Sequence, residues 1–302
     1  MPQLEPIAWL ANADADANAN ANADRDSDIE ASGDHAQPSG EWGHPDQLAL
    51  PLSDRGLQLA DGLFETVLVE QGEPRLLAQH LRRWHGSALL LGMAPPPGVQ
   101  VLGPGIAEAV RRSGIRQGAL RLNWSRGSGG RGLDLPAASA TQPVHRFWLQ
   151  LSDCQPVFAG LTAIISRQER RNADSLLSRC KSFAYGGQIQ ARREARAAGA
   201  DDALLLSTNG ELCCGSAANL LVLHSNQWWT PPASSGCLPG VMRQRALESG
   251  LAREASLSRA DLLSSDGALL INSLGCRALL SCDGQPLPTL SVAATLWRSL
   301  LN

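Results

Sequence analysis

The sequence contains one lysine, Lys181, within the stretch SLLSRCKSFAYGG at residues 175–187, and all its other basic residues are arginines. Arginine serves as well as lysine where only surface charge is needed, but its guanidinium does not deprotonate in proteins. A lysine that arginine cannot replace is one whose amine must at times be neutral, for proton transfer or covalent bonding to an aldehyde. Lys181 is therefore either a chemically active amine or a chance survivor of compositional drift. The one tyrosine, Tyr185, lies four residues further on.

The glycine-rich string RGSGGRG at residues 126–132 holds Arg126 and Arg131 close together. It contains the letters GxGxxG, but LDLPAASATQP follows it, and no helix is predicted there to receive a dinucleotide pyrophosphate. A Rossmann fold is therefore not expected. Forked guanidinium groups suit carboxylate or phosphate, so these arginines are interpreted either as an anion site or as two solvated loop residues.

Two other segments supply hydrogen-bonding groups. GCLPGVMRQ (236–244) places Pro-Gly before a helix, so the amides of Gly240, Val241 and Met242 are expected to form an anion site at the helix N-terminus. LLINSLGCR (269–277) ends a strand at Asn272 and Ser273. With Lys181, these groups match the needs of pyridoxal 5′-phosphate (PLP): an amine for the aldehyde, donors for the phosphate and a partner for the ring nitrogen.

The predicted elements around these residues indicate an α+β protein with two domains, 1–152 and 153–302, joined by a linker near residue 153. A hairpin is predicted over 62–77 with its turn at residues 71–73, and a helix follows in which apolar residues repeat with 4,3,4,3 spacing to form a core face. These apolar residues are Leu77, Leu81, Trp84, Ala88 and Leu91. Other strands are expected at 5–11, 119–127, 145–151, 161–166 and on both sides of a turn at 209–210, and helices directly after Lys181 and at 241–250 and 290–301. Residues 12–45 have almost no large apolar groups, so they are expected to be a disordered insertion.

Composition narrows the classes of protein. The net charge of −3 over 302 residues argues against a nucleic-acid or anionic-membrane binder. No apolar run is long enough for a transmembrane helix, and no signal peptide pattern opens the chain. The seven cysteines contain no CxxC pair, so no disulfide framework and no metal site are expected. A cytoplasmic location is the resulting expectation.

Five ordered motifs over about residues 50–285 resemble the fold-type IV PLP enzymes (the class IV aminotransferase family), which include branched-chain and D-amino-acid aminotransferases and aminodeoxychorismate lyases. The motifs are DRGLQLADGLFET (54–66), HLRRWHGSA (80–88), RRNADSLLSRCKSFAY (170–185), NGELCCGSAANLLVL (209–223) and LPGVMRQ (238–244). The resemblance implies a smaller α/β N-terminal domain and a larger C-terminal pseudo-barrel domain. It also implies that Lys181 is the Schiff-base lysine, that Arg83 binds the cofactor phosphate, and that the protein is a homodimer. Tyr185 either contacts the cofactor or packs in the core.

Within this family, RGSGGRG resembles the lyase branch. That resemblance implies conversion of 4-amino-4-deoxychorismate to 4-aminobenzoate and pyruvate, a step toward folate, with Arg126 and Arg131 binding the substrate carboxylates. Two alternatives stay open: a D-amino-acid or branched-chain aminotransferase, and a PLP-binding protein without turnover.

One residue departs from the family pattern. Ungapped alignment between Gly210 and Asn219 puts Cys214 where most members have the glutamate that keeps the pyridine nitrogen protonated, and Glu211 lies three positions too early. A neutral thiol is only a weak donor. The substitution is expected to cost an aminotransferase more than a lyase, unless Cys214 merely fills space.

Overall fold

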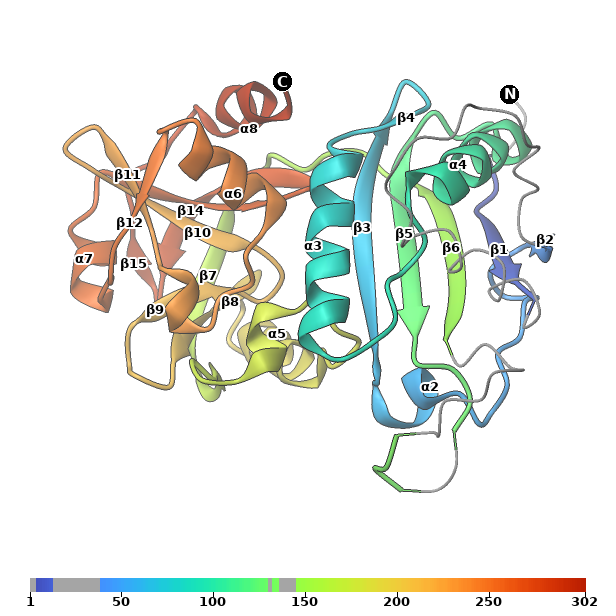
Figure 1. Cartoon of the computed structure of the whole chain (residues 1–302). Coiled ribbons are helices and arrows are strands. Elements are labelled where there is room, and N and C mark those ends of the chain that lie inside the picture. Colours follow the sequence, from blue (N-terminus) through green and yellow to red (C-terminus); the bar gives the residue numbers. More distant parts are fainter. Residues whose placement is uncertain (1–3, 13–38, 130–131, 136–144) are drawn as a thin grey trace, which may run out of the picture. The chain divides into compact units, whose positions relative to one another are not determined.

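The computed structural model describes residues 4–12, 39–129, 132–135 and 145–302 (Figure 1). Two compact units make up the chain, Met1–Gln155 and Pro156–Asn302.

The N-terminal unit contains a six-stranded antiparallel sheet in the order β2-β1-β6-β5-β3-β4. Its strands are β1 (Ile7–Ala11), β2 (Gly40–Gly43), β3 (Gly62–Glu70), β4 (Glu73–Pro74), β5 (Gln117–Ser125) and β6 (Arg146–Asp153). The hairpin of β3 and β4 confirms the predicted turn, in which Gln71 and Gly72 have φ values of 58° and 88°. A short helix, α2 (Arg55–Leu59), precedes β3.

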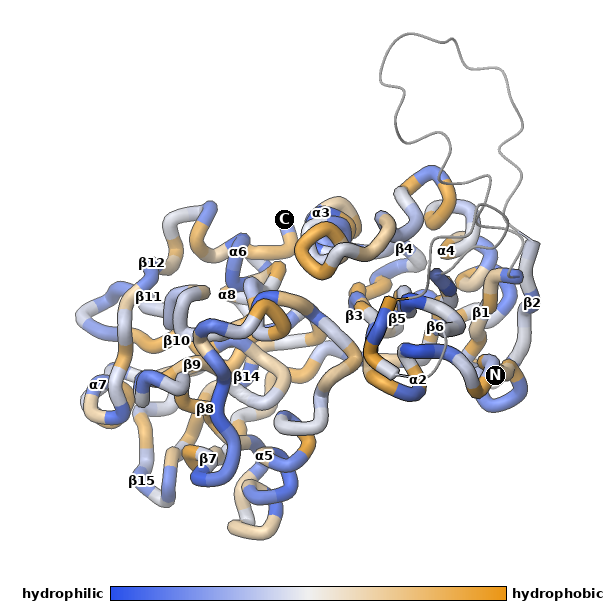
Figure 2. Tube along the Cα trace, turned by 60° about the horizontal axis from the view of Figure 1, so that its bottom comes forward, coloured by the Kyte–Doolittle hydropathy of each residue, from blue (hydrophilic) through white to orange (hydrophobic). Residues whose placement is uncertain are grey.

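Helices α3 (Leu77–Leu90) and α4 (Val99–Ser113) pack on one face of this sheet (Figure 1). The helix predicted from the 4,3 spacing is confirmed as α3, with Leu81, Trp84 and Ala88 buried. Its tube alternates between hydrophobic and hydrophilic segments (Figure 2). The sequence did not predict α4, because Gly103, Pro104 and Gly105 in its middle are typical of a turn.

The expectation that residues 12–45 form a disordered insertion is wrong at the C-terminal end of this segment. Residues 13–38 lie outside the described residues, but Gly40–Gly43 form strand β2, with Trp42 paired to Trp9 on β1. The two indole rings are 6.3 Å apart, and the Arg112 guanidinium lies 5.2 Å from the Trp42 ring. The tryptophan gives this short segment enough apolar contact to order it, despite its polar surroundings in the sequence.

The C-terminal unit is built on a nine-stranded sheet that closes on itself. The strand path β10-β13-β14-β7-β8-β9 returns to β10 through the pair Asn219↔Cys214, so six strands form a barrel. These strands are β7 (Leu161–Arg171), β8 (Asp202–Ser207), β9 (Leu212–Gly215), β10 (Asn219–His224), β13 (Gly267–Asn272) and β14 (Gly275–Cys282). Strands β11 (Gln227–Thr230), β12 (Ala252–Glu254) and β15 (Gln285–Pro286) extend it. The expected pseudo-barrel is confirmed.

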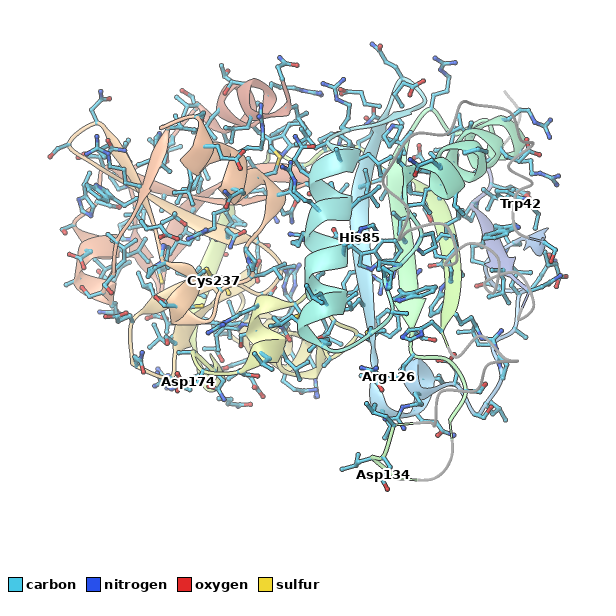
Figure 3. All side chains as sticks on the ribbon, in the orientation of Figure 1. Trp42, His85, Arg126, Asp134, Asp174 and Cys237 are labelled. Carbon is cyan, nitrogen blue, oxygen red and sulfur yellow. The ribbon has the colours of Figure 1, made fainter. Side chains whose placement is uncertain are left out.

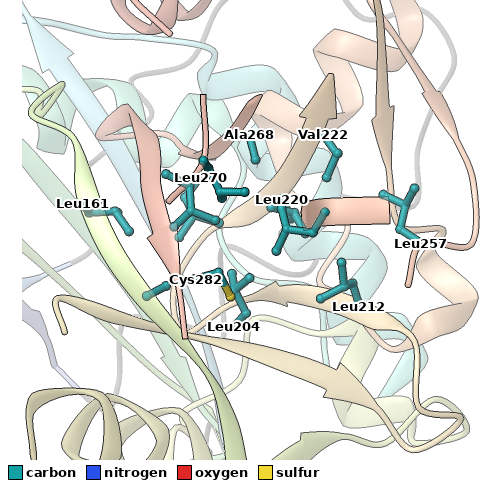
Figure 4. Packing of buried hydrophobic residues seen from close by; sticks show 13 residues of the cluster. Leu161, Leu204, Leu212, Leu220, Val222, Leu257, Ala268, Leu270 and Cys282 are labelled. Atoms are coloured by element: carbon teal, nitrogen blue, oxygen red, sulfur yellow. The ribbon is translucent and has the colours of Figure 1, made fainter. Parts of the chain in front are cut away.

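Aliphatic side chains from every barrel strand pack into one core, which includes Leu161, Leu204, Leu212, Leu220, Leu270 and Leu279 (Figure 4). Four helices belong to this unit, α5 (Gly186–Ala197), α6 (Val241–Glu248), α7 (Arg259–Leu263) and α8 (Ala293–Leu301), among the residues the structure describes. The segment 202–223 contains three strands rather than the two predicted around the 209–210 turn, because residues 216–218 turn the chain again.

Candidate active site

Lys181 lies in the connection between a single 3-10 turn, η1 (Leu176–Arg179), and helix α5. Ser175 begins η1 by accepting a hydrogen bond from the Leu177 amide at 3.2 Å. Lys181 Nζ donates a hydrogen bond to the Tyr185 hydroxyl at 3.1 Å and lies 5.3 Å from its ring centroid. The structure therefore brings the single lysine and the single tyrosine into direct contact. A phenol hydroxyl both donates and accepts, so it can hold the amine in either protonation state.

The segment before α6 is fixed by Asn219, the first residue of β10. Asn219 Nδ2 donates to Leu238 O at 2.8 Å, and a Cβ added to Gly240 would lie 2.0 Å from Asn219 Oδ1. Gly240 is therefore required by this close approach. Its amide donates to Leu238 O at 2.8 Å, so of the three predicted anion-binding amides, those of Val241 and Met242 belong to the open first turn of the helix.

Cys214 lies where the barrel closes. It is 8% exposed and pairs with both Leu205 and Asn219. The register shifts between Leu205 and Leu206, so Cys213 is an extra residue in β9. As a result, Cys213 and Cys214 both pack with Leu205 and the alanines of α5, outside the barrel core.

The thiol of Cys213 contacts those of Cys214 and Cys237. Hydrogen bonds to Cys214 and Cys237, together with burial, raise the pKa of Cys213. Cys213 is therefore a protonated thiol at neutral pH. The three sulfur atoms form a soft, buried cluster beside the strand that carries Cys214.

Asn272 and Ser273 form the turn between β13 and β14. Asn272 Nδ2 donates to Ala217 O at 3.1 Å, and its Oδ1 accepts from the Leu274 amide at 2.8 Å. The Asn272 side chain thus ties its turn to the loop after Cys214. This role of Asn272 is structural.

In the N-terminal unit, Arg83 is oriented by a buried carboxylate. Its Nε and one terminal nitrogen donate to the two oxygens of Glu65 at 2.8 and 2.5 Å, and His80 Nδ1 lies 2.7 Å from the same carboxylate. Burial alone would raise the pKa of Glu65, but the charge of Arg83 and the hydrogen bonds from His80 and Arg83 lower it to about 2. Glu65 is therefore ionised, and Arg83 is held in one plane on α3.

Arg126, labelled in Figure 3, follows the end of β5. Its side chain is buried and makes several hydrogen bonds within the N-terminal unit. It donates to both oxygens of Asp61 at 3.0 and 3.1 Å, and to the carbonyls of Leu91 and Gly92 at 2.9 Å each. Asp61 also accepts from Arg55 Nε at 2.9 Å. This geometry favours a role for Arg126 in holding its loop, and Arg131 lies outside the described residues.

Three residues that organise these sites were not singled out from the sequence: Glu65, Asp61 and Arg171. Each lies inside a motif quoted above, in GLFET, LADG or RRNADS. Their positions in those motifs were the available signal. Their partners lie on other segments of the chain, between 6 and 65 residues away, so only the fold shows what they bind.

A closed barrel with an amine-bearing segment beside it, preceded by a unit with an antiparallel sheet and two packed helices, is the architecture of the fold-type IV enzymes. The family model described as Amino-transferase class IV matches residues 62–282. The chain belongs to the class IV aminotransferase family, and it is an enzyme of that family. The family prediction made from the five motifs is confirmed.

Relatives with different activities resemble this chain. The bifunctional aminodeoxychorismate lyase / D-amino acid transaminase of Mycobacterium tuberculosis is 28% identical over 276 residues, which cover 84% of this chain and 93% of the relative. A putative branched-chain-amino-acid aminotransferase of Methanocaldococcus jannaschii is 28% identical over 206 residues, covering 68% and 69%.

Solved structures confirm the fold. A putative 4-amino-4-deoxychorismate lyase from Legionella pneumophila is similar with a TM-score of 0.75 at 26% identity, covering 85% of this chain and 94% of that one. The PLP-bound form of a hypothetical aminotransferase from Mycobacterium tuberculosis has a TM-score of 0.72 at 25% identity, covering 87% of this chain and 95% of that one.

Within the described part of this chain, no helix is long and apolar enough to cross a membrane.

Proposed function

We propose that this chain is a PLP-dependent lyase that converts 4-amino-4-deoxychorismate to 4-aminobenzoate and pyruvate. Pyridoxal 5′-phosphate is the cofactor, which the family and its PLP-bound structural neighbour support. The observation that carries the lyase assignment is Cys214, a buried thiol at the barrel closure where the family resemblance places a glutamate. The names of the Mycobacterium and Legionella relatives support the same assignment.

The described residues fit PLP. Lys181 supplies an amine, and Tyr185 orients it at 3.1 Å. The first turn of α6 begins at a glycine that has no room for a Cβ, and helix N-termini bind phosphate through their amides. Within the C-terminal unit, we assign phosphate binding to the amides of Val241 and Met242 and to the hydroxyl of Ser273. The family resemblance assigns Arg83 to the phosphate as well.

When bound, PLP supplies an electron sink for the carbanion that forms at an amine-bearing carbon. Lys181 Nζ would hold the cofactor aldehyde and, as a free amine, would remove the proton from the amine-bearing ring carbon of the substrate. The bond between the ring carbon and the enolpyruvyl oxygen would then break, the oxygen would leave with the electron pair as an enolate that takes up a proton at its methylene carbon to give pyruvate, and the ring would become aromatic. Tyr185 holds Nζ while it moves the proton. We assign the substrate carboxylates to the loop that carries Arg126 and Arg131.

Cys214 favours elimination over transamination for a physical reason. Transamination stores the carbanion charge in the pyridine ring, and a carboxylate beside the ring nitrogen stabilises the protonated ring that makes this storage favourable. A neutral thiol does not provide that charge. In elimination the charge passes to the leaving group, and aromatisation drives the step. The second candidate, a D-amino-acid or branched-chain aminotransferase, is supported by the names of the two relatives above.

The decisive experiment is incubation of the enzyme and PLP with aminodeoxychorismate, with separate assays for 4-aminobenzoate and pyruvate and with Lys181→Ala as the control. We expect equal amounts of both products from the wild type and none from the variant. Efficient transamination of D-alanine or leucine without 4-aminobenzoate would instead identify an aminotransferase. Covalent PLP at Lys181 with neither activity would identify a PLP-binding protein without turnover.

Two variants at one position test the role of Cys214. Cys214→Ala should retain most of the lyase activity, because this position already lacks the carboxylate that the family resemblance places there. Cys214→Glu should raise transamination of D-alanine more than lyase turnover. If Cys214→Ala abolishes lyase activity, the thiol itself takes part in the lyase reaction.

We further propose that the protein is a homodimer, which light scattering of the purified protein tests.

A further inference from the structure

Arg171, the last residue of β7, connects two segments of the C-terminal unit that are distant in sequence. Its Nε donates to Gly236 O at 3.0 Å, and one terminal nitrogen donates to Ser178 O at 3.0 Å. Ser178 lies in η1, three residues before Lys181, and Gly236 lies four residues before Gly240. One planar guanidinium therefore ties the lysine segment to the segment that leads into α6.

Gly236 also lies against the backbone that follows Arg171. Gly236 has φ +87°, and a Cβ added there would lie 2.9 Å from Asn172 O. Any side chain at this position would push the loop away from the backbone that follows Arg171. The contact therefore depends both on the fork of Arg171 and on the glycine at 236.

We propose that Arg171 is a positioning residue that sets the separation between the covalent anchor and the phosphate anchor of PLP. This inference rests on the proposed function, in which Lys181 binds the aldehyde and the first turn of α6 binds the phosphate. The aldehyde and the phosphate are carried by one rigid ring, so both anchors contribute fully only when the protein holds them at the matching distance. Arg171 donates to one backbone carbonyl in the segment before Lys181 and to one in the segment before α6. A lysine at this position has one point charge on a flexible stem and cannot span both carbonyls in a fixed plane.

The proposal makes a prediction that general destabilisation does not. Pyridoxal has the aldehyde but lacks the phosphate, so it uses only the Lys181 anchor and should not sense the separation. In Arg171→Lys we expect the affinity of the apoenzyme for PLP to fall about 10- to 100-fold, which corresponds to about 1.4–2.8 kcal/mol. The affinity for pyridoxal should stay within about twofold of the wild type.

The experiment titrates apoenzyme with PLP and with pyridoxal and follows the absorbance of the lysine adduct, without any assay of turnover. Arg170→Lys is the matched control. Arg170, the residue before Arg171, is exposed and donates one long hydrogen bond, to Ser207 O at 3.5 Å, so its replacement should leave the affinities for PLP and for pyridoxal unchanged. An unchanged PLP affinity in Arg171→Lys overturns the proposal. An equal loss for PLP and pyridoxal also overturns it, because the effect would then not depend on the phosphate.

Gly236→Ala perturbs the same contact from its other side and serves if Arg171→Lys does not fold. It should show the same selective loss for PLP, and a PLP-to-pyridoxal affinity ratio equal to that of the wild type contradicts the proposal. Borohydride reduction of the wild type separates the two levels of inference. If no pyridoxyl group appears on Lys181, the proposed function itself fails, whereas a labelled wild type with an insensitive Arg171→Lys refutes only the role of Arg171.

Discussion

Glu65 provides the sharpest test of how the N-terminal unit is stabilised. Its carboxylate is 1% exposed, and Arg83 and His80 are its partners. Replacing Glu65 by Gln removes the charge while keeping the size of the side chain. The guanidinium of Arg83, 11% exposed, then loses its counterion. Breaking a buried ion pair by removing one partner costs about 3–5 kcal/mol, and we expect Glu65→Gln to lower the free energy of unfolding by that amount at pH 7.

The pH dependence gives an independent magnitude. The pKa of Glu65 is lowered from 4.5 to about 2 in the folded protein, because the Arg83 charge and the His80 and Arg83 hydrogen bonds outweigh burial. At about 1.4 kcal/mol per pKa unit, the ionised form contributes about 3 kcal/mol. Because the folded pKa is the lower one, this contribution is fully present above about pH 4.5 and is lost as the pH falls toward 2.

The assay is urea unfolding of wild type and Glu65→Gln at a series of pH values from 7 downward. The difference in unfolding free energy should be constant between pH 7 and 5 and should shrink at lower pH. Glu108→Gln is the control, because the pKa of Glu108 is also lowered to about 2, through hydrogen bonds from Arg111 and Arg112, on the exposed surface of α4. Exposed ion pairs contribute little, so this variant should have a much smaller effect. A difference below about 1 kcal/mol for Glu65→Gln, or one that does not change with pH, would refute the reasoning.

Two further predictions concern the N-terminal unit. The Asn12 amide donates to Ser39 O at 2.9 Å, so the residues that flank segment 13–38 meet, and replacing this segment with an Asn-Gly turn should leave the melting temperature and the lyase activity unchanged. Removal of residues 13–43, which include β2 and Trp42, should instead lower the melting temperature. An equal loss in the shorter deletion would show that segment 13–38 contributes to the fold or to the site. Arg126→Met should lower the unfolding free energy by at least about 2 kcal/mol, because it removes one of the two arginines that donate to Asp61 and the guanidinium donors to two backbone carbonyls. A raised KM for aminodeoxychorismate with unchanged stability would instead support direct contact of Arg126 with the substrate.

Much of the fold could be predicted because its signals are local. The 4,3 spacing in α3 reflects one buried helix face, and the turn at residues 71–73 needs residues that accept positive φ. The chemical role of Lys181 stays a prediction from its being the one lysine in an arginine-rich chain, and the structure adds its hydrogen bond to Tyr185. By contrast, α4 was missed because Gly-Pro-Gly in its middle outweighs its apolar pattern, and β2 was missed because Trp42 orders it through a partner 33 positions earlier in the chain.

Only the tertiary structure decided what the arginines do. RGSGGRG indicates anion binding when taken alone, yet Arg126 is occupied by Asp61 and two carbonyls at the end of α3, groups more than 30 residues away in the sequence. Arg83 was assigned from its motif, but the carboxylate that orients it became visible only when β3 and α3 packed together. The orientation of Cys214 likewise depends on one extra residue in β9, which places Cys213 and Cys214 on the same side of the strand. Residue type and spacing therefore determined which groups are present, while long-range pairing determined which of them are already bound within the protein.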